Sequence, residues 1–271
     1  MFSRSLRFAA FACLLSAHAA QGVDKEERAA REAEDARDEA SSTMVANMLS
    51  DAERAGGWRL LFDGKTAPGF RGLKNFDFLK AGWRIDNGIL SLPKDVGKMG
   101  AVTGGDLITA EQFSDFEFAF QWKLGVSSNT GILYFAKAGL GQKPTGCEFQ
   151  IIDDMHHPDG LKGGPPHRSG ALLGILPPSA EKQLNDPGKW NAGRLVVQGN
   201  HVEHWVNDVK VLEYELGTRA FQQAIAASGV KVPAGFGMMK FKTAIVILDE
   251  GDEAYFRGLK VRLLPSTNAS R

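Results

Sequence analysis

Alternation of aromatic and polar residues in one short stretch constrains the fold of this chain most strongly. Phe116, Phe118, Phe120 and Trp122 occupy every second position, and Glu, Ala and Gln fill the positions between them. Successive side chains of a β-strand point to opposite faces of its sheet. The stretch therefore predicts a strand with one aromatic face toward a core.

Similar short runs continue along the chain from Gly57 and predict further strands. Asp86-Asn87-Gly88 and Asn207-Asp208 are typical of hairpin tips. Residues 218–228 alone show helical spacing. Many short strands with one minor helix predict an all-β fold, an antiparallel β-sandwich. The runs cover residues 83–92, 131–135, 147–152, 194–197, 202–206, 245–248 and 255–263.

Composition excludes some classes of partner. Of 271 residues, Lys and Arg together number 32, as do Asp and Glu. The formal net charge is therefore zero, which removes the overall electrostatic reason to expect nucleic acid or an anionic membrane as partner. The 31 glycines and 17 phenylalanines suit a turn-rich β-fold with a Phe-packed core.

The first residues predict an export signal, residues 1–20. Arg4 and Arg7 precede a short apolar run, and Ala17-His18-Ala19 offers small residues for cleavage. The run is shorter than the ~20 residues that span a bilayer, and no later stretch of that length lacks charges, so we expect no transmembrane segment. The sequence thus predicts a periplasmic or secreted protein in which Cys147 has no disulfide partner.

Three further boundaries follow from composition. Residues 21–55 are rich in alanine and charge, with acid-first i,i+4 pairs such as Glu27 and Arg31, and predict a charged helical linker. Residues 56–265 contain the strand patterns and predict the β-sandwich domain. Residues 266–271 predict a disordered tail.

Several common catalytic motifs are absent from the sequence. It contains no phosphate-binding Gly-x4-Gly-Lys-Ser/Thr loop, no Cys-x2-Cys and no His-Glu-x-x-His. A Gly-x-Ser-x-Gly nucleophile elbow is also missing. Nucleotide binding, structural zinc and serine-hydrolase chemistry therefore have no support.

Polar residues gather around one predicted strand. On a regular strand Glu148 and Gln150 share one face, while Phe149 and Ile151 point into the core. Asp153 joins the polar face only if a β-bulge at residues 151–153 shifts the register. Such a face suits sugar binding; the alternative is the solvated face of an edge strand.

A long loop is predicted next, over residues 153–176. It contains His156, His157 and Arg168, and loops of that length usually carry function. Asp154, His156 and His157 are weak candidates for binding a divalent cation, because their spacing matches no rigid ligand set. Solvated loop histidines are the alternative interpretation.

An ordered set of short segments makes the chain resemble the 3-keto-disaccharide hydrolase domain family. The resemblance implies a concanavalin-A-like lectin/glucanase fold, a jelly-roll sandwich, over roughly residues 57–264. The matching segments include Leu61–Lys65, Asn129–Ile132, Glu148–Asp154, Ser169–Ala171, Gly188–Asn191 and Ala254–Val261.

The resemblance also implies an activity, the cleavage of glycosides already oxidised at C3 by a separate glycoside 3-oxidoreductase. It implies Glu148 as the catalytic base, with Asp153 as the less favoured candidate. The substrate is a small sugar. The resemblance implies no definite cofactor, and the one candidate is a divalent cation. The residues expected to contact the sugar are Asn129, Lys137, Gln150, His156, His157 and Arg168.

Departures from the family pattern leave two other functions open. Phe135 replaces a usual Arg, Leu173 a usual Tyr, and Leu248 and Glu250 a usual Gln and His. One alternative is an ordinary glycosidase with a Glu148–Asp153 carboxyl pair. The other is a non-catalytic carbohydrate-binding module of laminin-G-like type.

Overall fold

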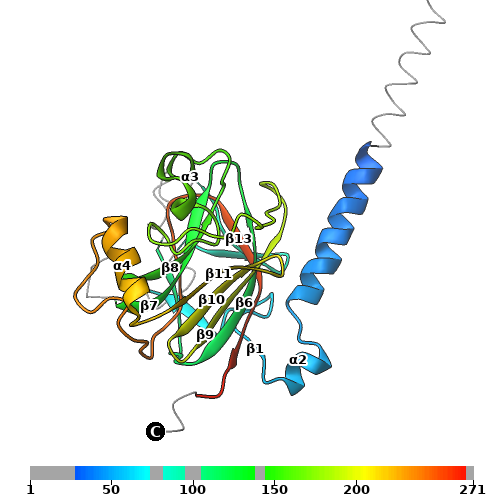
Figure 1. Cartoon of the computed structure of the whole chain (residues 1–271). Helices are drawn as coiled ribbons and strands as arrows, with labels where there is room; N and C mark the ends of the chain where they lie inside the picture. Colours follow the sequence, from blue (N-terminus) through cyan, green and yellow to red (C-terminus); the bar gives the residue numbers. More distant parts are fainter. Residues whose placement is uncertain (1–27, 74–81, 95–104, 138–143, 267–271) are drawn as a thin grey trace, which may run out of the picture. The chain divides into compact units, whose positions relative to one another are not determined.

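A computed structural model describes residues 28–73, 82–94, 105–137 and 144–266 of the chain (Figure 1). The predicted signal peptide and nearly all of the predicted tail lie outside these residues. The chain divides into two compact units, Met1–Thr43 and Met44–Arg271. A helix covers residues 28–46, and Arg28 and Glu32 form an exposed ion pair on it at 2.8 Å. None of the described helices is both long and apolar enough to cross a bilayer.

The second unit begins before residue 56, where the composition changes. The side chain of Asn47 donates to the carbonyl oxygen of Gly88 at 2.7 Å and accepts from the backbone N–H of Gly258 at 2.9 Å. Helix α2 (Asp51–Ala55) follows, with Ser50 and Glu53 forming a capping box. Composition could not reveal this boundary, because it depends on single polar contacts with strands distant in sequence.

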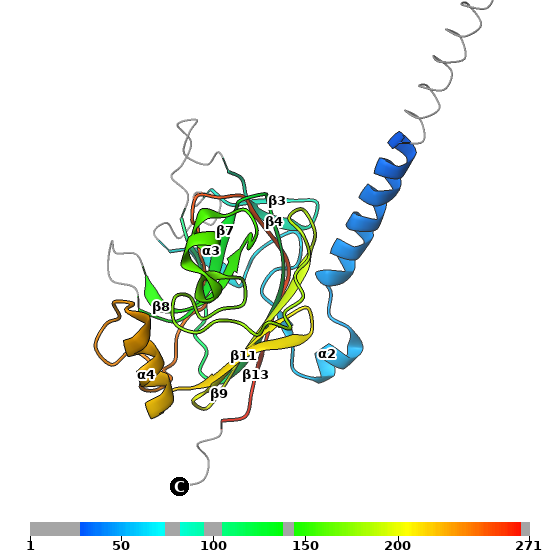
Figure 2. The ribbon, with the colours of Figure 1, turned by 45° about the horizontal axis from the view of Figure 1, so that its top comes forward.

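Two antiparallel sheets form the second unit (Figures 1 and 2). Within the described residues, the larger sheet has eight strands in the order β11-β10-β9-β6-β13-β4-β3, with β1 paired to β13. The smaller sheet has five strands in the order β2-β5-β12-β7-β8. The predicted all-β sandwich is therefore confirmed.

Strand bounds are as follows. The larger sheet comprises β1 (Arg59–Leu60), β3 (Arg84–Asp86), β4 (Ile89–Leu92), β6 (Phe116–Leu124), β9 (Asn191–Gln198), β10 (His201–Val206), β11 (Val209–Glu215) and β13 (Ala254–Leu263). The smaller sheet comprises β2 (Phe70–Gly72), β5 (Leu107–Thr109), β7 (Asn129–Lys137), β8 (Thr145–Ile152) and β12 (Val246–Ile247).

Aromatic side chains fill the space between the sheets. The four aromatic residues of β6 are at most 2% exposed, as their alternation predicts. Phe120 of the larger sheet meets Phe149 of the smaller sheet edge-on, with ring centroids 5.6 Å apart. Such edge-to-face pairs are favourable beyond the area they bury, so β8 is fixed against β6 by this contact.

The hairpin tips predicted from turn residues and the helix predicted from its spacing are both confirmed. Asn87 and Asn207 have φ of 49° and 46°, the left-handed conformation that the first position of a type I′ turn requires. Helix α4 (Arg219–Ser228) begins at Thr218, whose side chain accepts from the Phe221 N–H. It ends at Gly229 in the left-handed conformation.

The predicted loop over residues 153–176 contains more structure than expected. Helix α3 (Pro158–Gly163) starts where the His157 side chain accepts from the Asp159 N–H, and Pro158 occupies its first position. A 3₁₀ turn, η2 (Pro165–His167), follows it. The two proline positions start these turns, and the length of the segment alone gave no sign of them.

Candidate functional site

Strand register places Glu148 and Gln150 on the outer face of the smaller sheet. Leu133 of β7 pairs with Glu148, and Gly131 pairs with Gln150. Phe149 points the other way and is fully buried between the sheets. The predicted division of β8 into a polar face and a core face is therefore present.

Three polar side chains of this face form a row, with Gln150 in contact with both of the others. With its amide oxygen toward Asn129, Gln150 donates from its amide nitrogen to Glu148 Oε1 at 3.1 Å and to the Thr130 carbonyl at 3.2 Å. The oxygen lies 3.2 Å from the Asn129 side-chain amide. Gln150 is only 2% exposed and Glu148 is half-buried. We call Glu148, Gln150 and Asn129 the polar trio.

An apolar cluster borders the polar trio on the same sheet face. The pairing of four strands puts Ile108, Val246, Leu133 and Glu148 in one row across the sheet. Leu248, which stands where the family usually has Gln, belongs to the same cluster and is 1% exposed. Where the family usually has a polar residue, this chain therefore has part of a buried apolar cluster next to the trio.

The segment after η2 pairs with the free edge of β8. Gly170 N–H donates to the Gln150 carbonyl at 2.8 Å, and Gln150 N–H donates to the Ala171 carbonyl at 3.1 Å. Leu173 N–H donates to the Glu148 carbonyl at 3.1 Å. Both polar residues of β8 are thus held by main-chain hydrogen bonds on two sides, which fixes the directions of their side chains.

A buried histidine supports this segment from inside the sandwich. His204 of β10 is fully buried, its Nδ1 lies 3.0 Å from the Gly170 carbonyl oxygen, and its ring lies 4.5 Å from that of Phe149. Its Nε2 lies 2.7 Å from the Tyr134 hydroxyl, which is 2.7 Å from the Tyr214 hydroxyl. Sequence analysis did not select His204, although its position between Val202 and Val206 in an alternating strand signals an inward side chain.

The partners of His204 determine its protonation. A carbonyl oxygen only accepts, so Nδ1 carries the proton and donates to Gly170. Nε2 is then the acceptor for the Tyr134 hydroxyl, which in turn accepts from Tyr214. Desolvation by burial lowers the pKa of His204 to about 4, so the neutral imidazole persists at neutral pH.

Asp153 does not join the polar trio. The expected β-bulge at residues 151–153 was wrong, because β8 keeps its register to Ile152 and Asp153 N–H donates to the Ser128 carbonyl at 2.9 Å. The register shift lies instead beyond Tyr134, where Phe135 has a φ of 48°. Asp153 therefore projects to the side opposite Glu148.

Hydrogen bonds surround the Asp153 carboxylate. It accepts from the backbone N–H groups of Ser127 at 2.8 Å and Met155 at 3.1 Å, and it lies 2.8 Å from His156 Nδ1. Burial by itself raises the pKa of Asp153, but these N–H groups and His156 outweigh burial and hold the pKa below its usual value. This carboxylate shapes a turn and orients His156.

The remaining candidates do not converge on the trio. His157 caps α3 and lies 3.7 Å from Asp252, and Arg168 is exposed beyond η2. The Lys137 ammonium lies over the Phe241 ring at 5.2 Å, at the opposite end of β7 from Asn129. The sequence thus correctly grouped only those residues that share one face of β7 and β8.

The three weak metal candidates do not form one site either. Asp154 pairs with Lys182 at 2.5 Å, His156 with Asp153, and His157 with the start of α3. Among the described residues, the one group of potential ligand atoms within 4.8 Å of one another is His201, Glu203 and Glu213. Sequence analysis missed this group, whose members come from two strands of a hairpin. Lys210 lies 2.6 Å from Glu213 and supplies the cation there.

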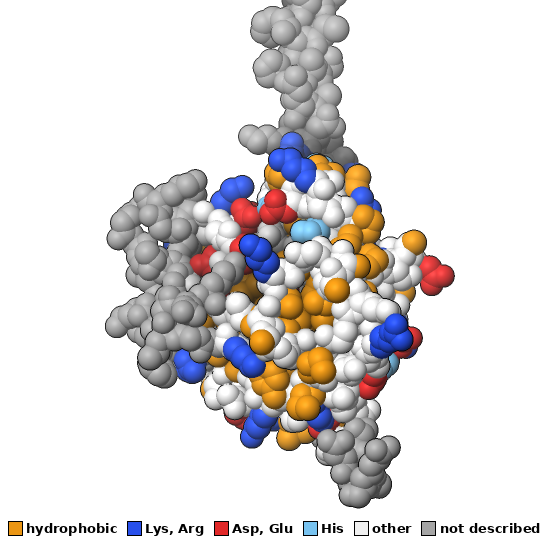
Figure 3. Space-filling model, turned by 60° about the vertical axis from the view of Figure 1, so that its left-hand side comes forward, with side chains coloured by type: hydrophobic (Ala, Val, Ile, Leu, Met, Phe, Trp, Pro, Cys, Tyr) orange, Lys and Arg blue, Asp and Glu red, His pale blue; other side chains and the backbone are white. Residues whose placement is uncertain are grey.

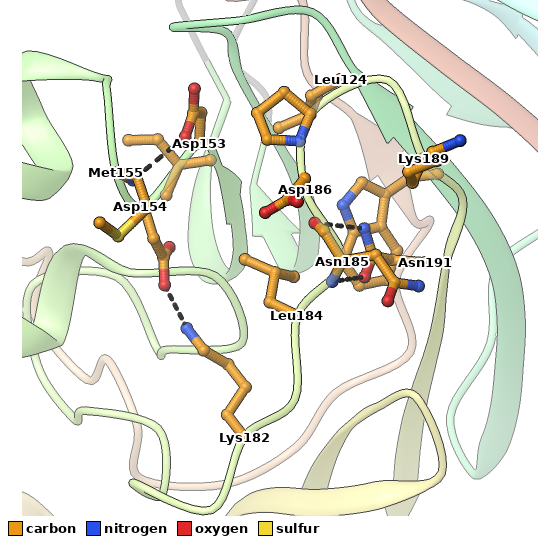
Figure 4. A pocket seen from close by; sticks show the side chains of 13 residues that line it. Leu124, Asp153, Asp154, Met155, Lys182, Leu184, Asn185, Asp186, Lys189 and Asn191 are labelled. Carbon is orange, nitrogen blue, oxygen red and sulfur yellow. Dashed lines mark hydrogen bonds and ion pairs between the residues drawn. The ribbon is translucent and has the colours of Figure 1, made fainter.

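A cavity of about 410 Å³ opens where β6 and β8 end (Figure 4). Leu184 and Asp186 project from one loop toward Asp154 on the opposite wall. Burial lowers the pKa of Lys182, while Asp154 opposes that effect. The lining residues are Trp122, Leu124, Ile152–Met155, Lys182, Leu184–Pro187, Lys189 and Asn191.

Charges of both signs are scattered over the face of the molecule that Figure 3 shows. In the view of Figure 3, hydrophobic side chains lie near the middle of the coloured surface, with basic and acidic side chains scattered around them. No large patch of one sign is visible in the part drawn in colour. Such a surface favours a neutral ligand over a polyanion.

Comparisons with known proteins agree on one family. The family described as "3-keto-alpha-glucoside-1,2-lyase-like domain" matches residues 57–262. A "3-keto-disaccharide hydrolase" of Bacteroides thetaiotaomicron is 29% identical over 264 residues, which cover 90% of this chain and 91% of the relative. Two crystal structures of proteins assigned as glycosyl hydrolases from Parabacteroides distasonis are also similar. One is 26% identical with a TM-score of 0.70, covering 81% of this chain and 99% of that chain; the other is 25% identical with a TM-score of 0.58, covering 76% and 99%.

Proposed function

The chain belongs to the family of 3-keto-alpha-glucoside-1,2-lyase-like domains, and on that premise we propose that it cleaves the glycosidic bond of 3-keto-disaccharides. The observation that carries the proposal is the polar trio, in which the Gln150 amide links the half-buried Glu148 carboxylate to the Asn129 amide on one sheet face. A carboxylate base and neutral hydrogen-bonding groups are what the reaction needs from the protein.

The proposed reaction starts at C2 of the oxidised sugar. The ketone at C3 acidifies the C2 proton, and the Glu148 carboxylate removes it to give an enolate. The enolate expels the substituent at C1, which leaves with a proton, and a C1–C2 double bond forms. Water then adds across that bond: its oxygen joins C1 and a proton returns to C2. The net change is hydrolysis.

Gln150 and Asn129 assist the removal of the C2 proton by orienting the Glu148 carboxylate and the sugar. Gln150 donates to Glu148 and to the Thr130 carbonyl and so orients the carboxylate. Asn129 spends one N–H on the Gln150 oxygen, and its second N–H can donate to the C3 oxygen as charge develops. Hydrogen bonds gain strength in a buried setting, and Gln150, which orients Glu148, is almost fully buried. His156, which we expected to contact the sugar, is oriented by Asp153.

Glu148 is a better base than Asp153. Four hydrogen bonds hold Asp153 in its ionised form and keep its pKa low, which weakens it as a proton acceptor. Glu148 and Asp153 also lie on opposite sides of β8, so they do not form the facing carboxyl pair of an ordinary glycosidase.

A non-catalytic sugar-binding role is the second candidate. The observation that favours it is Leu248, a buried apolar residue where the family usually has Gln. A protein that kept the trio but lost part of the catalytic set would bind the keto sugar without turning it over.

One assay distinguishes these functions. Purified wild type is given a 3-keto-disaccharide and, separately, its unoxidised parent, and released monosaccharide is measured. Cleavage of the keto sugar alone supports the proposal, and Glu148→Gln must then lower kcat by at least about 100-fold. Glu213→Gln, an acid on the larger sheet, is the matched control and keeps wild-type rates. Cleavage of the parent supports a glycosidase, and binding without cleavage supports the module.

We further propose that the protein acts in the periplasm or outside the cell, downstream of a glycoside 3-oxidoreductase. The predicted signal at residues 1–20 supports export. The chemistry supports the upstream partner, because the C2 proton is acidic enough only after C3 has been oxidised. Cell fractionation, and N-terminal sequencing for cleavage near residue 20, test the location.

A further inference from the structure

The cavity at the ends of β6 and β8 is separate from the polar trio. None of the trio residues lines it, and Ile152, where the cavity begins, lies four residues beyond Glu148 on β8. At about 3.3 Å per residue this distance is about 13 Å. A volume of about 410 Å³ falls in the range of small-molecule sites, about 300–1,000 Å³.

A buried lysine provides a hydrogen-bond donor to this cavity. The Lys182 side chain is 10% exposed, and two of its three N–H donors go to Asp154 at 2.5 Å and to the Ser169 carbonyl at 2.8 Å. Within the described part of the chain, the third donor has no acceptor. A ligand in the cavity can supply one.

An acceptor lies on the opposite wall. Asp186 projects into the cavity from the loop that also carries Leu184 (Figure 4). Its carboxylate makes no hydrogen bond to any other described residue. Apolar side chains, among them Leu184 and Ile152, form the surface between the two polar walls. The cavity thus offers the Lys182 donor on one wall, the Asp186 acceptor on the other, and apolar side chains in its lining.

The charges of the cavity exclude other classes of ligand. An added cation would be repelled by the Lys182 ammonium, which already pairs with Asp154. An anion meets the carboxylates of Asp153, Asp154 and Asp186, which outnumber the lysines of the lining, Lys182 and Lys189. An apolar ligand would strip water from the Asp154–Lys182 pair without replacing its hydrogen bonds. A neutral molecule with several hydroxyl groups and an apolar face satisfies all of these groups.

We propose that this cavity is a second, non-catalytic binding site for an unoxidised glycosyl unit of mono- to disaccharide size. The sugar accepts from Lys182, donates to Asp186, and lays its C–H face on Leu184. The inference does not depend on the proposed reaction, since binding here leaves the sugar unchanged.

Calorimetric titration with trehalose and with methyl α-glucopyranoside, each up to about 50 mM, tests the site. Wild type is expected to bind at least one of them. Leu184→Trp fills the cavity and abolishes binding, and Asp186→Ala weakens it about tenfold through a lost charge-assisted hydrogen bond. Glu181→Ala, an exposed acid in the same loop, is the matched control and binds as wild type does.

Three results overturn the inference. They are the absence of binding by both sugars, unchanged binding in Leu184→Trp and Asp186→Ala, and loss of binding in Glu148→Gln. The last places the sugar at the trio. Failure of the proposed reaction is distinguishable, because a wild type without turnover that still binds sugar through Leu184 and Asp186 contradicts the reaction alone.

Discussion

A methyl group on Gly131 would lie 2.4 Å from Oε1 of Glu148, closer than two such atoms approach in real structures. Gly131 pairs with Gln150, two residues along β8 from Glu148. The missing side chain on β7 therefore lets the Glu148 carboxyl lie across the neighbouring strand, beside the Gln150 amide. The position of the proposed base depends on a glycine on another strand.

Gly131→Ala tests that dependence. We expect kcat/KM for a 3-keto-disaccharide to fall at least about tenfold, because a displacement of about 1 Å at a reacting group costs up to about 100-fold. Steady-state kinetics on folded protein gives the value. Gly105→Ala is the control, since a Cβ there meets no atom within 4 Å. Equal kinetics for the two variants would show that the clash does not reach the reacting carboxylate.

Sequence patterns gave the fold because its signals are local. The alternation in β6, the Asn87 and Asn207 turns and the helical spacing of residues 218–228 each depend on a few neighbouring residues, and all were confirmed. The pairing of Gly131 with Gln150 depends on register between two strands, which no local pattern fixes.

The error over Asp153 has the same cause. The face of the sheet to which the Asp153 side chain points depends on where the register between β7 and β8 shifts. The shift follows Tyr134 on β7, where Phe135 has the left-handed conformation. The residues around Asp153 do not indicate the position of this register shift. His204, in contrast, could have been found, because an inward histidine between two inward valines needs buried partners.

His204 predicts a pH-dependent stability. Its pKa is about 4 in the folded protein and about 6.5 in the unfolded chain, so unfolding takes up a proton between these values. The stabilisation is fully present above pH 6.5 and declines as the pH falls toward 4. The loss from this group amounts to about 3 kcal/mol at most. Urea unfolding at a series of pH values measures it.

His204→Gln separates this contribution from that of the carboxylates. The variant is less stable than wild type at pH 7 by about 1–3 kcal/mol, because the hydrogen bonds to Gly170 and Tyr134 are weakened. Its stability must change less than that of wild type between pH 6.5 and 4. Parallel curves for the two proteins contradict the assignment of a neutral buried His204.

Asp153→Asn is expected to destabilise the turn after β8 rather than to stop catalysis. The amide loses acceptor capacity toward Ser127, Met155 and His156, at a cost of about 1–3 kcal/mol. Because folding depresses this pKa, the stabilisation is present above the ordinary value of about 3.9 and disappears as the pH falls through the folded value. Wild type and variant therefore begin to converge as the pH falls below about 4 and become alike only below the folded pKa of Asp153. A loss of kcat as large as that of Glu148→Gln would instead make Asp153 the base.

The Asp154–Lys182 pair predicts strong coupling between two substitutions. The side chains are 12% and 10% exposed, so Lys182→Met alone leaves a poorly solvated carboxylate without its cation, at a cost of about 3–5 kcal/mol. Asp154→Asn added to it removes the charge and keeps an oxygen for the Ser169 N–H, which now donates to Asp154 at 2.8 Å. The double variant should therefore be more stable than Lys182→Met. Urea unfolding of wild type, both single variants and the double variant gives the coupling energy, and additive losses would mean that the pair is solvated enough for each charge to stand alone.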